Sequence, residues 1–185
     1  MGTPKALLDL GGETFVDRLT GILGAECDPV IVVVGHEAEA VRAGAARERE
    51  AVFVTNPSYS DGQLSSLQCG LRAVPDDASG FLFTPVDHPA VEAATVALIA
   101  RAFRERRDGI SIIVPRFEGR HGHPVCCARE LLQEFLELTP EARASDAIRA
   151  HARATHYLDT GDAGVLRDID DCAAYDRLVR DWQAR

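Results

Sequence analysis

The chain has 185 residues, a formal net charge of −9, 46% hydrophobic residues and 26% charged residues. This length supports one domain with a sizeable core and is short for two, so we expect a single domain over residues 1–185. Non-specific nucleic-acid binding needs clustered Lys and Arg, so the acidic balance argues against such a partner. The longest apolar run, Val30–Val34, is far too short to span a membrane, and we expect no secretion signal. A cytoplasmic location is therefore expected.

The five cysteines form no Cys-x-x-Cys pair, and Cys126 and Cys127 are adjacent. Adjacent cysteines suit neither a simple disulfide nor a zinc knuckle. We therefore expect reduced cysteines buried in the core.

Short apolar runs alternate with helical patterns along the chain. Strands alternating with helices of this length are typical of βαβ units, which predicts an α/β, three-layer fold with a mainly parallel sheet covered on both faces. In chain order the predicted elements are a helix over 13–23, a strand over 29–35, a helix over 37–47, a strand over 51–55, a helix over 64–74, a strand over 80–84, a helix over 91–106, a strand over 110–115, a helix over 129–138, a short surface helix over 145–153 and a helix over 170–182.

Ligands of such sheets bind beyond the carboxyl ends of the strands, so the polar residues after each strand are candidates for chemistry. Asp87 follows the third predicted strand between Pro85 and Pro89, whose fixed φ angles stiffen the turn. Its carboxylate suits a Mg²⁺ ligand and equally suits a cap for the helix that begins near Val91. Asp168, in a second acidic segment, either joins Asp87 at one metal or lies solvated in a loop.

Four other features are candidates for binding or for capping. Ser65 and Ser66 lie in the first turn of a helix, where free N–H groups favour a base edge or an anion, or where a serine simply caps the helix. Residues 116–124 hold the densest basic group of the chain and suit a phosphorylated substrate. A zinc pair from His121 and His123 is not favoured, because no further His or Cys lies nearby. Lys5 taken alone is a solvated surface charge. Asp170 or Asp171 is expected to cap the last helix.

The order of these segments resembles the MobA-like NTP transferase family, and is most similar to its molybdenum cofactor cytidylyltransferases. The resemblance covers essentially the whole chain. Its segments are 1–12 (the second half of the family signature), 61–71 (the base-binding segment), 85–89 (the metal-binding turn), 119–124 (the Gly-His-Pro segment associated with molybdopterin) and 167–170 (the distal acidic motif).

The resemblance implies a nucleotide-diphospho-sugar transferase-like, doubly wound fold. It also implies transfer of CMP from CTP to the phosphate of molybdopterin, with Mg²⁺ as cofactor, release of pyrophosphate, and a molybdoenzyme or its chaperone as a further partner. The residues that it assigns are Lys5 and Asp87 for catalysis, Asp87 and Asp168 for the metal, Lys5, Ser65, Ser66 and Gly70 for the nucleotide, and Gly122, His123 and Pro124 for the acceptor.

The chain departs from the family pattern in two places. In the family a central strand and a phosphate-binding loop precede the segment that here begins at Met1, so we expect Met1 to be an internal methionine of the motif, with the start codon upstream. Without that strand we expect the sheet to be split and two of its edges to be open. His88 occupies a position that is often Gln. The alternatives are a nucleotidyltransferase using another NTP or a sugar phosphate, and a non-catalytic cofactor-binding protein.

Overall fold

A computed structural model describes residues 2–184, and Met1, the expected internal methionine, lies outside the described residues. No helix among the residues described is long and apolar enough to cross a membrane. The strands are β1 (Asp9–Leu10), β2 (Glu13–Thr14), β3 (Ile31–Val34), β4 (Val52–Thr55), β5 (Gly80–Phe83), β6 (Ile112–Phe117), β7 (Arg120–His121), β8 (Val125–Ala128) and β9 (Thr155–Asp159). The α-helices are α1 (Phe15–Gly24), α2 (Ala38–Gly44), α3 (Gln63–Leu71), α4 (Ala93–Arg104), α5 (Leu132–Glu137), α6 (Ala144–Ala150) and α7 (Cys172–Gln183).

The larger sheet has five strands, and its strand directions are mixed. β8 lies between β5 and β6 and is antiparallel to both, whereas β9 runs parallel to β6. The reversal follows from a tight turn at Glu118 and Gly119, which have φ values of 47° and 78° and fold β7 back onto the end of β6. The expected sheet was mainly parallel because β8, which no helical crossover precedes, was not predicted from the sequence.

The sheet is split as predicted. β3 and β4 form a separate parallel pair, in register from Ile31 opposite Val52 to Val34 opposite Thr55. Among residues 2–184, no strand pairs with the edge of β3 that faces away from β4, or with the edge of β5 that faces away from β8. A gap in strand pairing therefore separates the two sheets.

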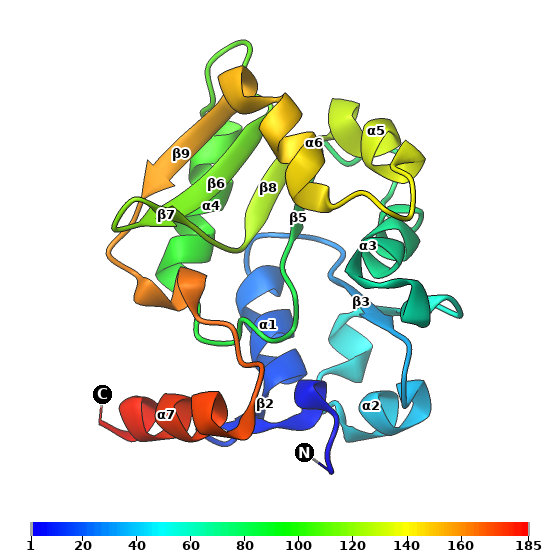
Figure 1. Ribbon diagram of the computed structural model, residues 1–185, viewed down its shortest axis with the longest axis vertical. Helices are drawn as coiled ribbons and strands as arrows, with labels where there is room; N and C mark the ends of the chain where they lie inside the picture. The colour runs from blue at the N-terminus through cyan, green and yellow to red at the C-terminus, as the bar shows by residue number, and fades with distance from the viewer. Residues whose placement is uncertain (1, 185) are drawn as a thin grey trace.

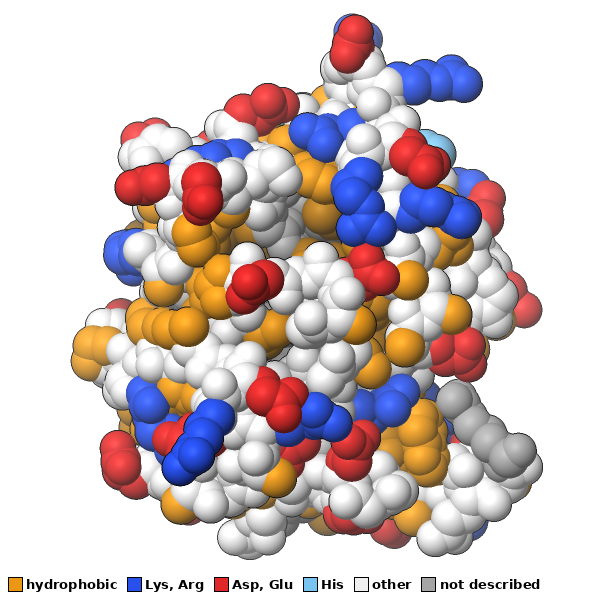
Figure 2. All heavy atoms as spheres, turned by 180° about the vertical axis from the view of Figure 1, so that it is seen from behind, with side chains coloured by type: hydrophobic (Ala, Val, Ile, Leu, Met, Phe, Trp, Pro, Cys, Tyr) orange, Lys and Arg blue, Asp and Glu red, His pale blue; other side chains and the backbone are white. Residues whose placement is uncertain are grey.

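Helices cover both faces of the larger sheet, which confirms the layered α/β arrangement (Figure 1). Side chains alternate along a strand, so Ile112 and Cys127 enter a core with α3, α5 and α6, while Ile113 and Cys126 pack against α4. All five cysteines are free as predicted, but only Cys126 and Cys127 are buried, whereas Cys172 is exposed. Each large apolar side chain buried in this way contributes about 1.5–3 kcal/mol. On the face that lies behind the view of Figure 1, acidic and basic side chains are interspersed, so the net negative charge of the chain is not concentrated on that face (Figure 2).

The first and last segments of the chain lie side by side at one end of the molecule (Figure 1). Leu10 and Phe15 share a core cluster with Leu178 of α7, and the Tyr175 hydroxyl donates to the Asp9 carbonyl at 2.8 Å. Asp171 is the N-cap of α7 and accepts from the backbone N–H of Ala174, which confirms one of the two predicted caps. This docking brings the N-terminal segment to the distal acidic motif.

Candidate active site

Asp87 lies in the turn that leaves β5, and its side chain is only 16% exposed. Among residues 2–184 no group donates a hydrogen bond to its carboxylate; Lys5 Nζ lies 3.7 Å from it and the ring nitrogen Nε2 of His88 lies 4.0 Å from it. The alternative role as a helix cap is wrong, because α4 begins at Ala93 with Glu92 at its N-cap. A largely buried carboxylate without a hydrogen-bond donor is well suited to hold a cation.

The distal acidic motif meets Asp87 at this turn. The backbone N–H of Ile169 donates to the Asp87 carbonyl at 2.9 Å, and the Ile169 side chain is fully buried. Lys5 Nζ donates to Asp170 Oδ1 at 3.0 Å, and this hydrogen bond and the positive charge of Lys5 lower the pKa of Asp170. Lys5 is therefore paired with two carboxylates rather than solvated alone.

His88 lies among the same carboxylates. Burial lowers its pKa, and the negative charges of Asp87, Asp168 and Asp170 oppose that shift. Asp170 and His88 are members of this centre that the resemblance did not assign. The signal for Asp170 was its spacing of two residues from Asp168 across the buried Ile169, but a helix-cap interpretation competed with it.

The donor set fits a divalent cation only in part. Among the residues described, no group of three or more His, Cys, Asp or Glu side chains is arranged to hold a metal ion. Mg²⁺, however, is commonly bound through one or two carboxylates plus phosphate oxygens and water. Asp87 and Asp168 both act on the His88 ring through their charge, so both carboxylates lie near this turn and remain the predicted ligands for such a cation.

The Gly-His-Pro segment lies beside this acidic centre, because β8 pairs with β5 and Val125 is opposite Phe83. A Cβ atom on Gly122 would collide with the Val165 carbonyl oxygen, and the His123 backbone N–H donates to that same carbonyl at 2.9 Å. The His123 ring contacts Phe83 at 6.1 Å and His88 at 4.9 Å between ring centroids. Gly122 permits the close approach of the backbone, buried Pro124 follows in the chain, and the His123 ring is the polar group that faces the centre.

Burial of the His123 imidazole lowers its pKa to about 4, with a further lowering by His88 that a hydrogen bond to Phe83 opposes. His123 is therefore neutral near pH 7. Two neighbouring basic residues, Arg116 and His121, are engaged elsewhere. Arg116 makes a bidentate ion pair with Asp159 at 2.6 and 2.8 Å, and His121 stacks on Tyr157 at 4.4 Å. His121 and His123 thus have different neighbours and do not form a metal pair.

The predicted base-binding segment begins α3, where Ser65 and Ser66 are held by a buried asparagine. Asn56 Nδ2 donates to Ser65 Oγ at 2.9 Å and to Ser66 Oγ at 3.1 Å, and Asn56 itself is 3% exposed. The Ser65 hydroxyl lies within hydrogen-bonding distance of two backbone carbonyls, those of Ser58 and Gly62. Gly62, with φ of 100°, is the N-cap, so neither serine caps the helix.

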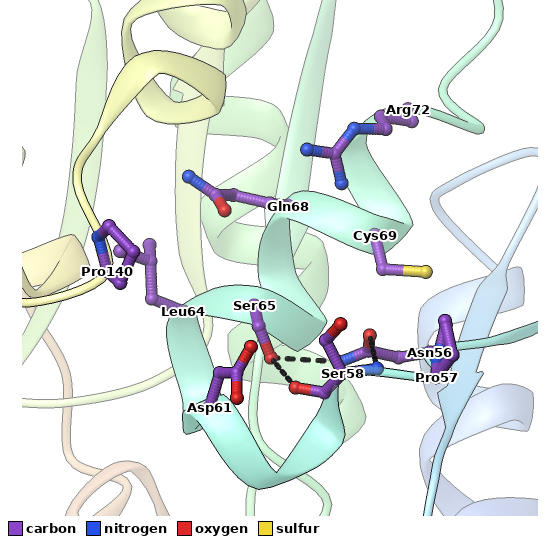
Figure 3. A pocket seen from close by; sticks show the side chains of 10 residues that line it. All are labelled: Asn56, Pro57, Ser58, Asp61, Leu64, Ser65, Gln68, Cys69, Arg72 and Pro140. Atoms are coloured by element: carbon purple, nitrogen blue, oxygen red, sulfur yellow. Dashed lines mark hydrogen bonds between the residues drawn. The ribbon is translucent and has the colours of Figure 1, made fainter.

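A cavity of about 290 Å³ opens next to these residues along α3 (Figure 3). Ser65 points from α3 toward Ser58 and Asn56 at one end of it, and Arg72 lies at the other (Figure 3). Gly70 has a packing reason to be glycine, because a Cβ there would lie 2.9 Å from Val33 Cγ2 of β3. Asn56 was missed as a key residue; its only sequence signal was a polar residue directly after a buried strand.

The layered fold and the acidic centre beyond β5 define a class of α/β nucleotidyltransferases. The MobA-like NTP transferase domain matches residues 1–155, and the chain belongs to this family. The molybdenum cofactor cytidylyltransferase of Escherichia coli (strain K12) is 25% identical over 171 residues, which is 92% of this chain and 84% of that protein. The bifunctional protein GlmU of Kineococcus radiotolerans is 32% identical over 113 residues, which cover 60% of this chain and 23% of that protein.

Solved structures resemble the whole chain. The crystal structure of Rv0371c from Mycobacterium tuberculosis H37Rv has a TM-score of 0.81 and 26% identity, and covers 97% of this chain and 91% of that chain. A structure of Rv0371c in complex with manganese has a TM-score of 0.80 and 26% identity, with coverage of 97% and 93% of the two chains. These similarities support the predicted nucleotidyltransferase fold.

Proposed function

We propose that this nucleotidyltransferase transfers CMP from CTP to the phosphate of a molybdopterin-type cofactor and releases pyrophosphate. The observation that carries the proposal is the meeting of Lys5, Asp87 and the distal acidic motif directly beside His123. The similarity to the E. coli cytidylyltransferase supports the choice of CTP and of the acceptor. The product would then pass to a molybdoenzyme or its chaperone.

The reaction needs no covalent nucleophile from the protein. A phosphate oxygen of the acceptor is already anionic and attacks the α-phosphorus of the nucleotide, while the bond to the pyrophosphate oxygen breaks. The protein contributes positioning and charge neutralisation. A general base is unnecessary because the attacking oxygen carries no proton at neutral pH, so the neutral His123 is assigned to acceptor binding rather than to proton transfer.

Asp87 and Asp168 would hold Mg²⁺, which supplies neutralisation of the charge that develops on the α-phosphate. Manganese in the Rv0371c structure supports a divalent cation in this family. Lys5 now neutralises Asp87 and Asp170, so a cation held by Asp87 would take over part of that neutralisation and leave the Lys5 ammonium group available for the triphosphate. Lys5 thus changes partners as the substrate binds.

The nucleotide base would lie at the start of α3. Ser66 Oγ accepts from Asn56 and makes no other hydrogen bond within residues 2–184, so its own hydrogen remains available for an acceptor atom on the base. The Ser65 hydroxyl is already engaged by backbone carbonyls and would act by fixing the loop. Gly70 lets α3 approach β3 closely and so sets the position of both serines.

The test is an end-point and rate assay with the purified chain, Mg²⁺, CTP labelled in its α-phosphate and molybdenum-loaded cofactor. We expect release of pyrophosphate and label in a cofactor dinucleotide. Parallel reactions with GTP, UTP and ATP, and with hexose 1-phosphate as acceptor, identify the base and the acceptor. Turnover with another nucleotide or another acceptor would retain the nucleotidyl transfer reaction and change its assigned substrates. Binding of the cofactor without pyrophosphate release in any of these reactions would identify a non-catalytic binding protein.

A further inference from the structure

Two imidazole rings contact each other where the acidic centre (Asp87, Asp168 and Asp170) meets the Gly-His-Pro segment (119–124), which we call the acceptor segment. His88 comes from the turn after β5 and His123 from the loop before β8, and their ring centroids are 4.9 Å apart with an interplanar angle of 58°. Within residues 2–184, the buried side-chain nitrogen and oxygen atoms that have no hydrogen-bond partner are Nδ1 of His88 and Nδ1 of His123. Both unpaired atoms thus occur at one contact.

Two buried nitrogens without hydrogen-bond partners lower the stability of the protein unless a bound ligand forms the missing hydrogen bonds. A buried polar atom without a partner costs about 1–3 kcal/mol, and nearly all buried polar groups in folded proteins are paired. Packing alone does not require nitrogen at either position, because an apolar ring of similar shape fills the same space. Two adjacent unpaired nitrogens therefore indicate a polar group that a ligand supplies.

The chemistry of the pair limits what that group is. The pKa of about 4 keeps His123 neutral near pH 7, so its ring does not attract a phosphate by charge. The neutral His123 ring has one N–H donor and one lone-pair acceptor. The Phe83 ring lies 6.1 Å from His123, and the His88 ring adds a second unpaired nitrogen at the same contact. This arrangement suits a flat, uncharged group that carries both donors and acceptors.

We propose that His88 is a specificity-determining residue which, together with His123, binds an uncharged amide-like edge of the acceptor while the phosphate of the acceptor lies at the acidic centre. This inference rests on the proposed function. His88 joins the two regions, because its Nε2 lies 4.0 Å from Asp87 Oδ1. The terminal torsion of a histidine is broad and roughly two-fold, so each ring can turn Nδ1 toward a ligand without movement of the backbone.

The first test separates recognition of the acceptor from recognition of the nucleotide. His88→Phe keeps a flat ring and removes both nitrogens, and His88→Gln restores one donor and one acceptor. We expect His88→Phe to raise the KM for the acceptor by about tenfold or more and to leave the KM for the nucleotide within about twofold. His88→Gln should recover most of the loss. The matched control is His156→Phe, which alters an exposed ring on β9 outside the site, and its kinetics should stay at the wild-type values.

The inference is wrong if His88→Phe and His88→Gln behave alike, or if the KM for the nucleotide rises as much as that for the acceptor. A second measurement does not depend on turnover. Long-range ¹H–¹⁵N spectra of the wild-type histidine rings are recorded with 6-hydroxymethylpterin, an uncharged heterocycle with an amide edge, and with inorganic phosphate. We expect the Nδ1 signals of His88 and His123 to shift with the pterin and not with phosphate.

The two measurements distinguish failure of the inference from failure of the proposed function. A shift with the pterin in a protein that releases no pyrophosphate would retain the binding pair and reject the transferase. Pyrophosphate release without any shift at His88 and His123 would retain the transferase and reject the pair. The spectra also decide the matter if His88→Phe does not fold.

Discussion

The acidic centre beyond β5 and the start of α3 are both polar, but their polar groups are used differently. At the start of α3, Asn56 donates to Ser65 and Ser66 and so fixes both side chains, and Ser65 donates within its own loop. At the acidic centre, the Asp87 carboxylate and the Nδ1 atoms of His88 and His123 receive no hydrogen bond from residues 2–184. Hydrogen bonds within the protein fix the start of α3, whereas the acidic centre retains polar atoms that can still bind a ligand.

This difference separates residues that build the site from residues that bind ligands. A polar group that is satisfied inside the protein stabilises a loop, and its removal should affect folding first. A polar group that is buried without a partner reduces stability and is retained for binding or chemistry. The two regions should therefore respond in opposite ways to substitution.

The largest effect is expected at Asp87. Asp87→Asn removes a negative ligand from the centre and should reduce kcat/KM by about a thousandfold, while the melting temperature changes by less than about 2 °C because no hydrogen bond to the carboxylate is lost. Pyrophosphate release and thermal unfolding measure the two quantities. The control is Asp76→Asn, whose fully exposed carboxylate pairs with Arg129. An active Asp87→Asn variant would remove the distinction between the regions.

The next effect concerns how the acceptor segment is placed. Gly122→Ala introduces a methyl group against the Val165 carbonyl, so we expect the free energy of unfolding to fall by about 2–3 kcal/mol, as in other overpacked sites. Urea unfolding measures the change. Gly161→Ala is the matched control, because a Cβ there meets no atom within 4 Å. Equal stability of the two variants would show that the segment adapts to the added volume.

Removal of the asparagine at the start of α3 should mainly affect folding. Asn56→Ala leaves the two serine hydroxyls and the Ser58 N–H without their partner, so the free energy of unfolding should fall by about 2 kcal/mol. Exposed Ser60→Ala is the control, with a change of less than about 0.5 kcal/mol. If Asn56→Ala instead lost nucleotide use at full stability, Asn56 would belong to the binding residues and the comparison would fail.

The smallest effect is a dependence of stability on pH that comes from His123. Its pKa is about 4 in the folded protein and 6.5 as the ordinary value, so below pH 6.5 the unfolded chain takes up a proton that the folded chain does not. The stability is fully present above pH 6.5 and is lost as the pH falls toward 4. Between pH 7.5 and 5.0 the loss should be about 2 kcal/mol at most.

The measurement is urea unfolding of the wild-type protein and of His123→Gln at both pH values. The variant lacks the titrating ring, so it should lose less stability than the wild type over this interval. The same loss in both proteins would show that other groups, such as the neighbouring His88, cause the pH dependence.

Much of the fold was predictable from local pattern. The continuous apolar run over 29–35 became β3, and the helical spacing over 91–106 became α4. β8 and β9 were not predicted. β8 is four residues long and follows a polar turn, and β9 alternates polar and apolar side chains within a polar stretch. Short strands of this kind are stabilised by their neighbours in the sheet rather than by their own composition.

The candidate site was predictable in its parts and less so in its contacts. Asp87, after a strand and between prolines, was found from its position, and the order of the motifs led to the family that residues 1–155 match. The sequence could not show that Lys5 would donate to Asp170, 165 residues away. It also could not show that Asn56 would hold both serines, since the same residues are equally compatible with a helix cap.

The sequence by itself determined the alternation of strands and helices, the burial of Cys126 and Cys127 and the order of the motifs, because these depend on side-chain chemistry and on spacing along the chain. Only the tertiary structure decided which groups meet and which remain unpaired. Docking of α7 on the N-terminal segment brings Lys5 to Asp170, and pairing of β8 with β5 brings His123 to His88. Those contacts depend on packing between distant segments of the chain. A local sequence pattern does not show whether a buried atom will find a hydrogen-bond partner in another segment.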